Sequence, residues 1–100
     1  MPGKILSYEL SSAADVDLDE IFDYTVNKFG FDQAVFYLGS IVDVLETLPS
    51  NPHLGKQRAE IRNELYGVLH GKHVIFYRIM FDRIRIIRIL HGSRDLPKYF

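Results

Sequence analysis

The sequence predicts an α+β fold in which an N-terminal strand and an antiparallel helical hairpin precede a three-stranded antiparallel sheet. Residues 72–81 and 84–91 are rich in β-branched and aromatic residues, contain no Pro or Gly, and are separated by only two residues, as in a β-hairpin. Residues 12–48 instead repeat apolar residues every three or four positions, as amphipathic helices do. A length of 100 residues with 47% hydrophobic residues indicates one domain, spanning residues 1–100.

The first strand and the first helix are predicted from the N-terminal quarter of the chain. Residues 4–10 alternate loosely and predict a short strand at a sheet edge. Ser11 and Ser12 offer a helix N-cap, and the spacing from Ser12 to Asp15 fits a capping box. Acidic side chains crowd the first turns, where they favour the positive end of the helix dipole. They are expected to form a solvated face and comprise Asp15, Asp17, Asp19 and Glu20.

The second helix is predicted to follow almost at once. Gly30 is expected to end the first helix in a left-handed conformation, and Asp32 is expected to cap the second. Pro49 ends the second helix, because proline lacks the amide hydrogen that a helix needs. Gly39 lies inside it and would allow the first helix to approach closely. So short a connection predicts an antiparallel helical hairpin.

The C-terminal half supplies the sheet and a short tail. Residues 49–57 have the composition of a loop, residues 65–69 predict another strand, and residues 92–100 form a tail. Strict alternation gives both faces of the two long strands a largely apolar centre. The helical hairpin can cover one face, and the nine-residue tail is expected to be too small for the other. We therefore expect an apolar surface rimmed by Arg that binds a partner; the alternative is that the tail and the aliphatic Arg stems cover it.

The charges divide between the two halves of the chain. Residues 1–50 carry a net charge of −7 and residues 51–100 a net charge of +6, although the whole chain carries −1. A basic half of this kind would attract an acidic partner or a nucleic-acid backbone. The alternative is that the two halves neutralise each other within the folded domain.

The sequence contains few residues that suggest catalysis or metal binding. Its four His residues lack metal-ligand spacing, there is no Cys, and the Gly residues form no phosphate loop, so we expect neither metal nor cofactor. His73, His91 and Arg94 could still neutralise a phosphate and transfer a proton, which is sufficient to cleave RNA through its 2′-hydroxyl group. Alternatively, these residues bind the tail backbone and an acidic partner.

Several motifs resemble those of a known family. The segments Asn-Pro-His-Leu-Gly (51–55), Glu-Ile-Arg (60–62), His-Val-Ile-Phe-Tyr-Arg (73–78) and Ile-Arg-Ile-Leu-His (87–91) carry the resemblance. It extends from about residue 6 to residue 96. The chain is similar to ParE, within the RelE/ParE superfamily of bacterial toxins from toxin–antitoxin operons.

This resemblance implies a cytoplasmic toxin of a type II toxin–antitoxin system. A cognate antitoxin would neutralise it by wrapping an acidic C-terminal segment around it, in a higher-order complex. The toxin would poison DNA gyrase by protein binding, without catalytic residues, membrane contact or direct DNA binding of its own. The residues expected to bind the antitoxin are Arg62, Tyr66, Phe76, Arg78, Ile86 and Arg88. The residues expected to bind the target are Arg94, Lys98 and Tyr99.

Two other functions remain open from the sequence. RelE-like members of the superfamily cut mRNA on the ribosome, and this activity would use His73, His91 and Arg94 here. RelE-type enzymes, however, have Arg where this chain has His73, and Arg94 and Tyr99 match their basic and aromatic residues only approximately. This favours binding over catalysis. A third possibility is a partner-binding module without toxicity.

Overall fold

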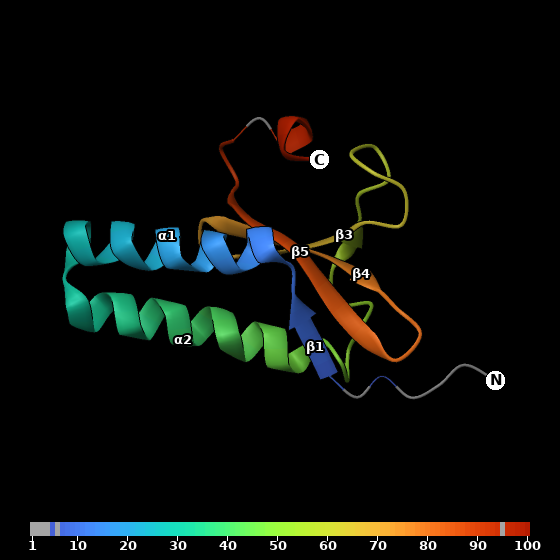
Figure 1. Cartoon of the computed structure of the whole chain (residues 1–100), viewed down its shortest axis with the longest axis horizontal. Coiled ribbons are helices and arrows are strands. Elements are labelled where there is room, and N and C mark those ends of the chain that lie inside the picture. The colour runs from blue at the N-terminus through green and yellow to red at the C-terminus, as the bar shows by residue number, and fades with distance from the viewer. Residues whose placement is uncertain (1–4, 6, 95) are drawn as a thin grey trace.

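The computed structural model describes Ile5, residues 7–94 and residues 96–100. Figure 1 shows a long helical hairpin that extends beyond one side of a twisted sheet. The elements, in chain order, are β1 (Ser7–Leu10), α1 (Ser12–Phe29), α2 (Phe31–Thr47), β2 (Lys56–Gln57), β3 (Tyr66–His70), β4 (His73–Ile79), β5 (Arg83–His91) and the 3₁₀ turn η1 (Leu96–Tyr99). The predicted α+β order of strand, helical hairpin and sheet is therefore confirmed. Within the described part of the chain, neither helix has the length and apolar composition needed to cross a membrane.

The sheet has five strands in the order β1-β5-β4-β3-β2, rather than the predicted three antiparallel strands beside a separate first strand. β1 joins the sheet parallel to β5, while the other neighbouring pairs are antiparallel. β2 lies within the segment predicted to be a loop, and its two residues pair with Gly67 and Tyr66 of β3. Of the strand predicted over residues 4–10, residues 4 and 6 lie outside the described part of the chain, and Ser7–Leu10 is confirmed as an edge strand.

The serine that precedes α1 connects the helix to the sheet. Ser11, not Ser12, is the N-cap, and its hydroxyl oxygen accepts a hydrogen bond from the amide of Ala14 at 3.0 Å. The same hydroxyl donates to the carbonyl oxygen of Ile87 at 2.7 Å, and the amide of Ser11 donates to Ile86 at 2.9 Å. Ser11 therefore caps the helix and continues the edge pairing of β5 beyond the end of β1.

The connection between the helices is a single glycine. Gly30 has φ = 94°, a backbone conformation that favours glycine, and it is both the end of α1 and the N-cap of α2. Asp32 was expected to cap α2, but it lies in the first turn of the helix instead. The expectation for Gly39 is also wrong. Among the described residues, no heavy atom outside the backbone of its own helix lies within 4 Å of the position that its Cβ would occupy.

A β-bulge changes the alternation of side chains in β5. Phe76 of β4 pairs with Arg88, but the next residue, Tyr77, pairs with Ile86, so Ile87 has no Cα partner in β4. The alternation shifts by one residue at this point. Ile86 and Ile89 therefore contact the same core beneath the helices, although strict alternation placed them on opposite faces.

The second face of the sheet is covered by the chain itself. A second core of Leu65, Val74, Phe76 and Leu90 packs against partly buried residues of the 58–65 loop, the bulge and the C-terminal tail. Phe100 contacts Phe76 edge to face, with ring centroids 5.0 Å apart, and Phe76 is 0% exposed. The expectation of an uncovered apolar face is therefore wrong over the second core, where four large side chains of the loop and tail cover it. These are Ile61, Leu96, Tyr99 and Phe100.

Candidate functional site

An open groove with a volume of about 460 Å³ lies on the side of the sheet opposite the helices. Its cationic wall comes from two neighbouring strands, because Arg78 of β4 pairs in register with Arg85 of β5. We call it the arginine groove. It is lined by Ser11, Ala13, Arg62, Arg78, Met80, Arg85, Ile87, Arg88, Tyr99 and Phe100. Apolar and cationic side chains thus line the same concave surface.

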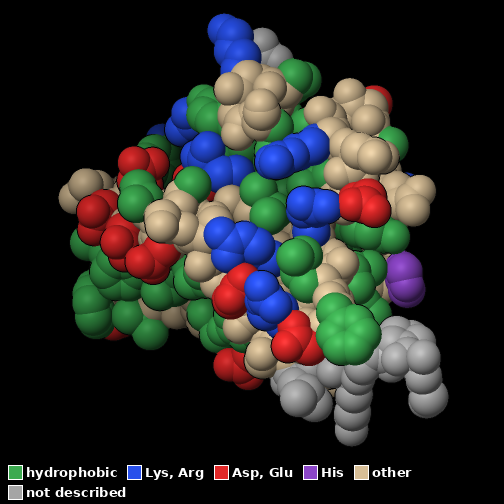
Figure 2. All heavy atoms as spheres, turned by 45° about the vertical axis from the view of Figure 1, so that its right-hand side comes forward, with side chains coloured by type: hydrophobic (Ala, Val, Ile, Leu, Met, Phe, Trp, Pro, Cys, Tyr) green, Lys and Arg blue, Asp and Glu red, His purple; other side chains and the backbone are tan. Residues whose placement is uncertain are grey.

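The arginine groove keeps a positive character although some of its cations are paired. Arg78 contacts Glu64 at 2.7 Å and Arg85 contacts Glu9 at 2.8 Å, but all four side chains are at least 35% exposed. Exposed pairs of this kind are weak and can exchange partners at little cost. Among the described residues, Arg62 has no carboxylate within ion-pair distance. Figure 2 shows Lys and Arg side chains gathered over the middle of this view, with some Asp and Glu side chains beside them and a separate group of Asp and Glu at the left.

One groove arginine has a structural role instead. Arg88 donates from Nε and Nη2 to the two carboxylate oxygens of Asp17, at 2.8 Å each, and the amide of Ile89 donates to the same carboxylate at 2.9 Å. Asp17 is only 5% exposed, so the predicted solvated acidic face is wrong at this position. The hydrogen bond with Asp17 raises the pKa of Arg88. Arg88 therefore ties α1 to β5, and its guanidinium also lies 5.3 Å from the ring centroid of Tyr99.

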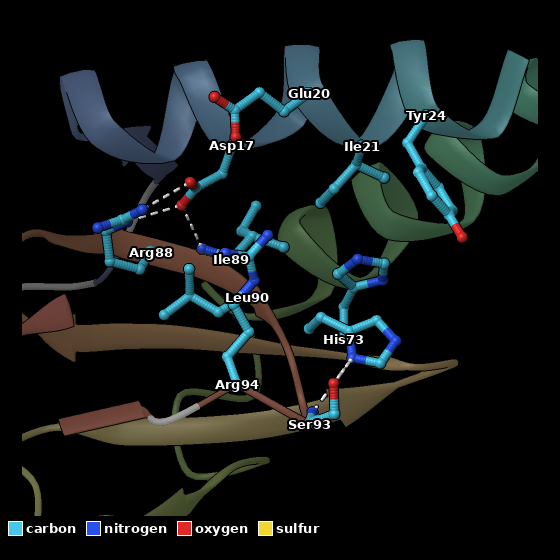
Figure 3. A pocket seen from close by; sticks show the side chains of 11 residues that line it. Asp17, Glu20, Ile21, Tyr24, His73, Arg88, Ile89, Leu90, Ser93 and Arg94 are labelled. Atoms are coloured by element: carbon cyan, nitrogen blue, oxygen red, sulfur yellow. Dashed lines mark hydrogen bonds and ion pairs between the residues drawn. The ribbon is translucent and has the colours of Figure 1, made fainter. Parts of the chain in front are cut away.

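A second cleft, of about 330 Å³, lies between α1 and the end of β5. We call it the histidine cleft. His73, His91 and Arg94, the three residues expected to act in RNA cleavage, all line it (Figure 3). The rings of His73 and His91 are 5.5 Å apart, and the Nδ1 atom of His91 accepts a hydrogen bond from the amide of Ser93 at 3.1 Å. The structure thus brings together the three residues that the sequence suggested as one site, because His73 of β4 pairs with His91 of β5.

The surroundings of the histidine cleft limit the proton transfer and phosphate binding that its residues can perform. Burial, followed by the nearby charges of His91, His70 and Arg94, lowers the pKa of His73 from 6.5 to about 4, so the ring is neutral at pH 7. The Tyr37 hydroxyl lies 2.6 Å from Nδ1 of His73 and engages that nitrogen. On the opposite wall, the exposed carboxylate of Glu20 disfavours a bound phosphate, whereas Asp17 is paired with Arg88. The described residues also contain no group of three or more His, Cys, Asp or Glu placed to hold a metal ion.

We expect His73 to make the fold sensitive to acid. Its folded-state pKa lies below the unfolded value, so the stability that the neutral ring contributes is complete above pH 6.5 and is lost as the pH falls to about 4. Because the ring is only partly buried and solvent screens its charge, the loss should be only about 1–2 kcal/mol. Urea unfolding of the wild type and of His73→Gln between pH 7 and pH 4 measures it.

The control for this acid sensitivity is His53→Gln, because His53 is exposed. His73→Gln should reduce the pH dependence of the unfolding free energy in this window, and His53→Gln should leave it as in the wild type. Equal pH slopes for the wild type and His73→Gln would contradict the prediction.

The residues expected to bind the antitoxin do not form one surface. Arg62, Arg78 and Arg88 line the arginine groove, but Tyr66 packs against the main core and stacks on Tyr77 at 5.6 Å. Phe76 and Ile86 are each 0% exposed, the first beneath the tail and the second beneath the helices. Four further residues line the groove but were not expected to bind the antitoxin, namely Arg85, Met80, Ile87 and Phe100. The turn was expected at residues 82–83, but it lies at Phe81 and Asp82, because β5 already begins at Arg83. Pairing outward from the correct turn places Arg85 opposite Arg78.

The residues expected to bind the target lie at the C-terminal end of the chain. Arg94 donates to the hydroxyl oxygen of Tyr99 at 2.8 Å, and its guanidinium lies 5.6 Å from the centroid of the same ring. The guanidinium of Arg88 also lies close to that ring, and Lys98 is exposed. Tyr99 lines the arginine groove and contacts both Arg94, which lines the histidine cleft, and Arg88, which lines both cavities.

The comparison with protein families decides the assignment. Residues 8–96 match the family described as ParE toxin of type II toxin-antitoxin system, parDE. The chain belongs to the ParE toxin family. Toxin ParE1 of Mycobacterium tuberculosis is 35% identical over 92 residues, which are 91% of this chain and 94% of that protein. Toxin ParE1 of Caulobacter vibrioides is 35% identical over 88 residues, which are 88% of this chain and 91% of that protein.

Solved structures share the fold of this ParE-family chain. The structure described as the chromosomal ParDE TA system from P. aeruginosa matches with a TM-score of 0.77 at 22% identity, over 89% of this chain and 98% of that one. The toxin–antitoxin complex RelBE2 from Mycobacterium tuberculosis matches with a TM-score of 0.61 at 19% identity, over 91% of this chain and 99% of that one. Both matches support the ParE/RelE-like fold, and the sequence relatives establish the ParE family.

Proposed function

We propose that this ParE-family toxin is a single domain that poisons DNA gyrase in the cytoplasm by binding it. A cognate antitoxin would neutralise the toxin by laying an acidic segment in the arginine groove, within a larger complex. The observation that carries the antitoxin part is the groove itself, with four arginines around an apolar floor. These are Arg62, Arg78, Arg85 and Arg88.

The chemistry of the arginine groove supports an acidic amphipathic ligand. Met80, Ile87 and Phe100 line the groove beside the arginines and can contact apolar side chains of such a segment. The ion pairs Arg78–Glu64 and Arg85–Glu9 are exposed, so a ligand carboxylate can replace Glu64 or Glu9 with little loss. Charge complementarity would then accelerate association and exclude basic competitors.

Inhibition of gyrase is tested with purified components. We expect the supercoiling of relaxed plasmid by gyrase to fall as the toxin is added, and to recover when the toxin is first mixed with the antitoxin encoded beside it. The reaction that contains the antitoxin is the matched control, because the antitoxin sequesters the toxin without changing gyrase. Unchanged supercoiling at a hundredfold molar excess of folded toxin would refute gyrase as the target.

Ribosome-dependent cleavage of mRNA is the second candidate function. It is supported by the convergence of His73, His91 and Arg94 on the histidine cleft, and it is opposed by the carboxylate of Glu20 on the facing wall. If this activity is real, mapping of mRNA 5′ ends after induction should reveal new ends within codons at the ribosome. The ends should disappear in His91→Ala. Identical end maps before and after induction would exclude it.

A further inference from the structure

The exposed face of α2 carries apolar side chains that the rest of the described chain leaves exposed to solvent. Figure 1 shows α2 as the helix farther from β5, and its contacts are mostly with α1. The buried stripe of α2 consists of Ala34, Ile41 and Leu45. The opposite stripe, spaced at three or four residues, is fully on the surface and comprises Asp32, Val35, Phe36, Gly39, Asp43 and Glu46. We call this the outer face of α2.

The centre of the outer face is apolar. Phe36 is 72% exposed and Val35 is 49% exposed, so two large apolar side chains lie against solvent next to a glycine. The outward side of a surface helix is normally polar, and these two apolar side chains interrupt an otherwise acidic face. Isolated exposed apolar residues need no explanation, but a contiguous group on one helix indicates a contact surface.

Gly39 provides an independent observation. Glycine within a helix lowers its stability relative to alanine, and the lack of a side chain allows another backbone to approach closely. Here the described residues place no heavy atom outside the helix's own backbone within 4 Å of a Cβ at Gly39, so no element of this chain explains it. The geometry points to a second helix from outside that crosses α2 at Gly39 between Phe36 and Asp43.

The charges at the ends of the outer face specify the partner. Residues 31–47 contain no Lys or Arg, and the ends of the face carry Asp32 on one side and Asp43 and Glu46 on the other. A second copy of α2 would bring these carboxylates together and is disfavoured by repulsion. An acidic antitoxin segment fits the arginine groove and not this face. We propose that the outer face of α2 binds the target of the toxin through an amphipathic helix with basic flanking residues, an inference that rests on the proposed function as a toxin.

The decisive variant is Gly39→Leu. The added side chain meets open space in the free toxin and replaces a weak helix former, so the melting temperature should be unchanged or higher. A helix that crosses at Gly39 would clash with it. We expect Gly39→Leu and Phe36→Lys to need at least tenfold more protein for half-maximal inhibition of gyrase, while the affinity for the co-encoded antitoxin stays within twofold. Gln33→Leu, at an exposed position outside the face, is the matched control.

The outcomes separate this proposal from the choice of gyrase as target. Wild-type potency of both Gly39→Leu and Phe36→Lys would overturn the proposal, as would a tenfold loss of antitoxin affinity in either. If the wild-type toxin does not inhibit gyrase, growth arrest after induction without antitoxin replaces supercoiling as the readout. Arrest that is lost in Gly39→Leu and kept in Gln33→Leu would then support the outer face for another target, whereas arrest kept in both would overturn it.

Discussion

Asp17→Ala should lower the free energy of unfolding by about 3 kcal/mol, the largest effect that we expect from a single substitution. The substitution removes three hydrogen bonds, two from Arg88 and one from the amide of Ile89. It leaves the guanidinium of Arg88, whose side chain is 22% exposed, without its carboxylate partner. Urea denaturation monitored by circular dichroism at pH 7 measures the loss.

The matched control for Asp17→Ala is Asp19→Ala on the same helix. Asp19 is exposed, so its removal should change stability by less than about 0.5 kcal/mol. The double variant Asp17→Ala/Arg88→Ala should lose less stability than the sum of the two single variants. It removes both members of the ion pair and therefore leaves no unpaired charge buried. Equal losses for Asp17→Ala and Asp19→Ala would show that the contact contributes nothing specific.

Arg62→Glu/Arg78→Glu should weaken binding of the co-encoded antitoxin by about a hundredfold to a thousandfold, or about 3–4 kcal/mol. Both side chains line the arginine groove, and neither is held by a buried carboxylate as Arg88 is. Reversal of the two charges would place two new carboxylates in the groove, and these would repel an acidic ligand. Isothermal titration calorimetry at physiological salt measures the change.

The control for the groove variant is Lys56→Glu/Lys72→Glu, which changes the net charge equally at exposed positions outside the groove. It should weaken binding less than about fivefold, because screening reduces interactions beyond a Debye length of roughly 8 Å. Equal weakening by the two double variants would mean that only overall charge matters and that the groove is not the antitoxin site. Equal melting temperatures for all variants would exclude misfolding as the cause.

The long strands could be predicted from the sequence because their residues leave no alternative. Runs such as Val74–Tyr77 contain only β-branched and aromatic residues, and a turn of two residues sets the pairing at one end. The bulge could not be predicted, because Ile86 and Ile87 are both apolar and either could face the core. The pairing of β1 with β5 is equally hidden, because a four-residue strand carries too little pattern to choose a partner.

The candidate sites were predictable only in part, for related reasons. Arg62, Arg78 and Arg88 share the arginine groove as expected, although Arg88 is committed to Asp17. The covering of the second face was missed because Tyr99 and Phe100 are near the end of a short tail, where sequence pattern gives no position. Asp17 was placed with its acidic neighbours because helical periodicity alone cannot reveal an arginine that reaches it from 71 residues away.

The pairing of β1 with β5 delays completion of the fold until nearly the whole chain has been synthesised. Ser7 aligns with Arg83, and the contact of Ser11 with Ile87 joins residues 76 positions apart. Contacts between residues so far apart in the sequence slow folding, because a long loop must first close at a cost in chain entropy. A nascent chain on the ribosome would carry the helical hairpin without the strands that organise it. Each newly made molecule would therefore be harmless for most of its translation, which gives a co-translated neutralising protein time to be present when β5 emerges.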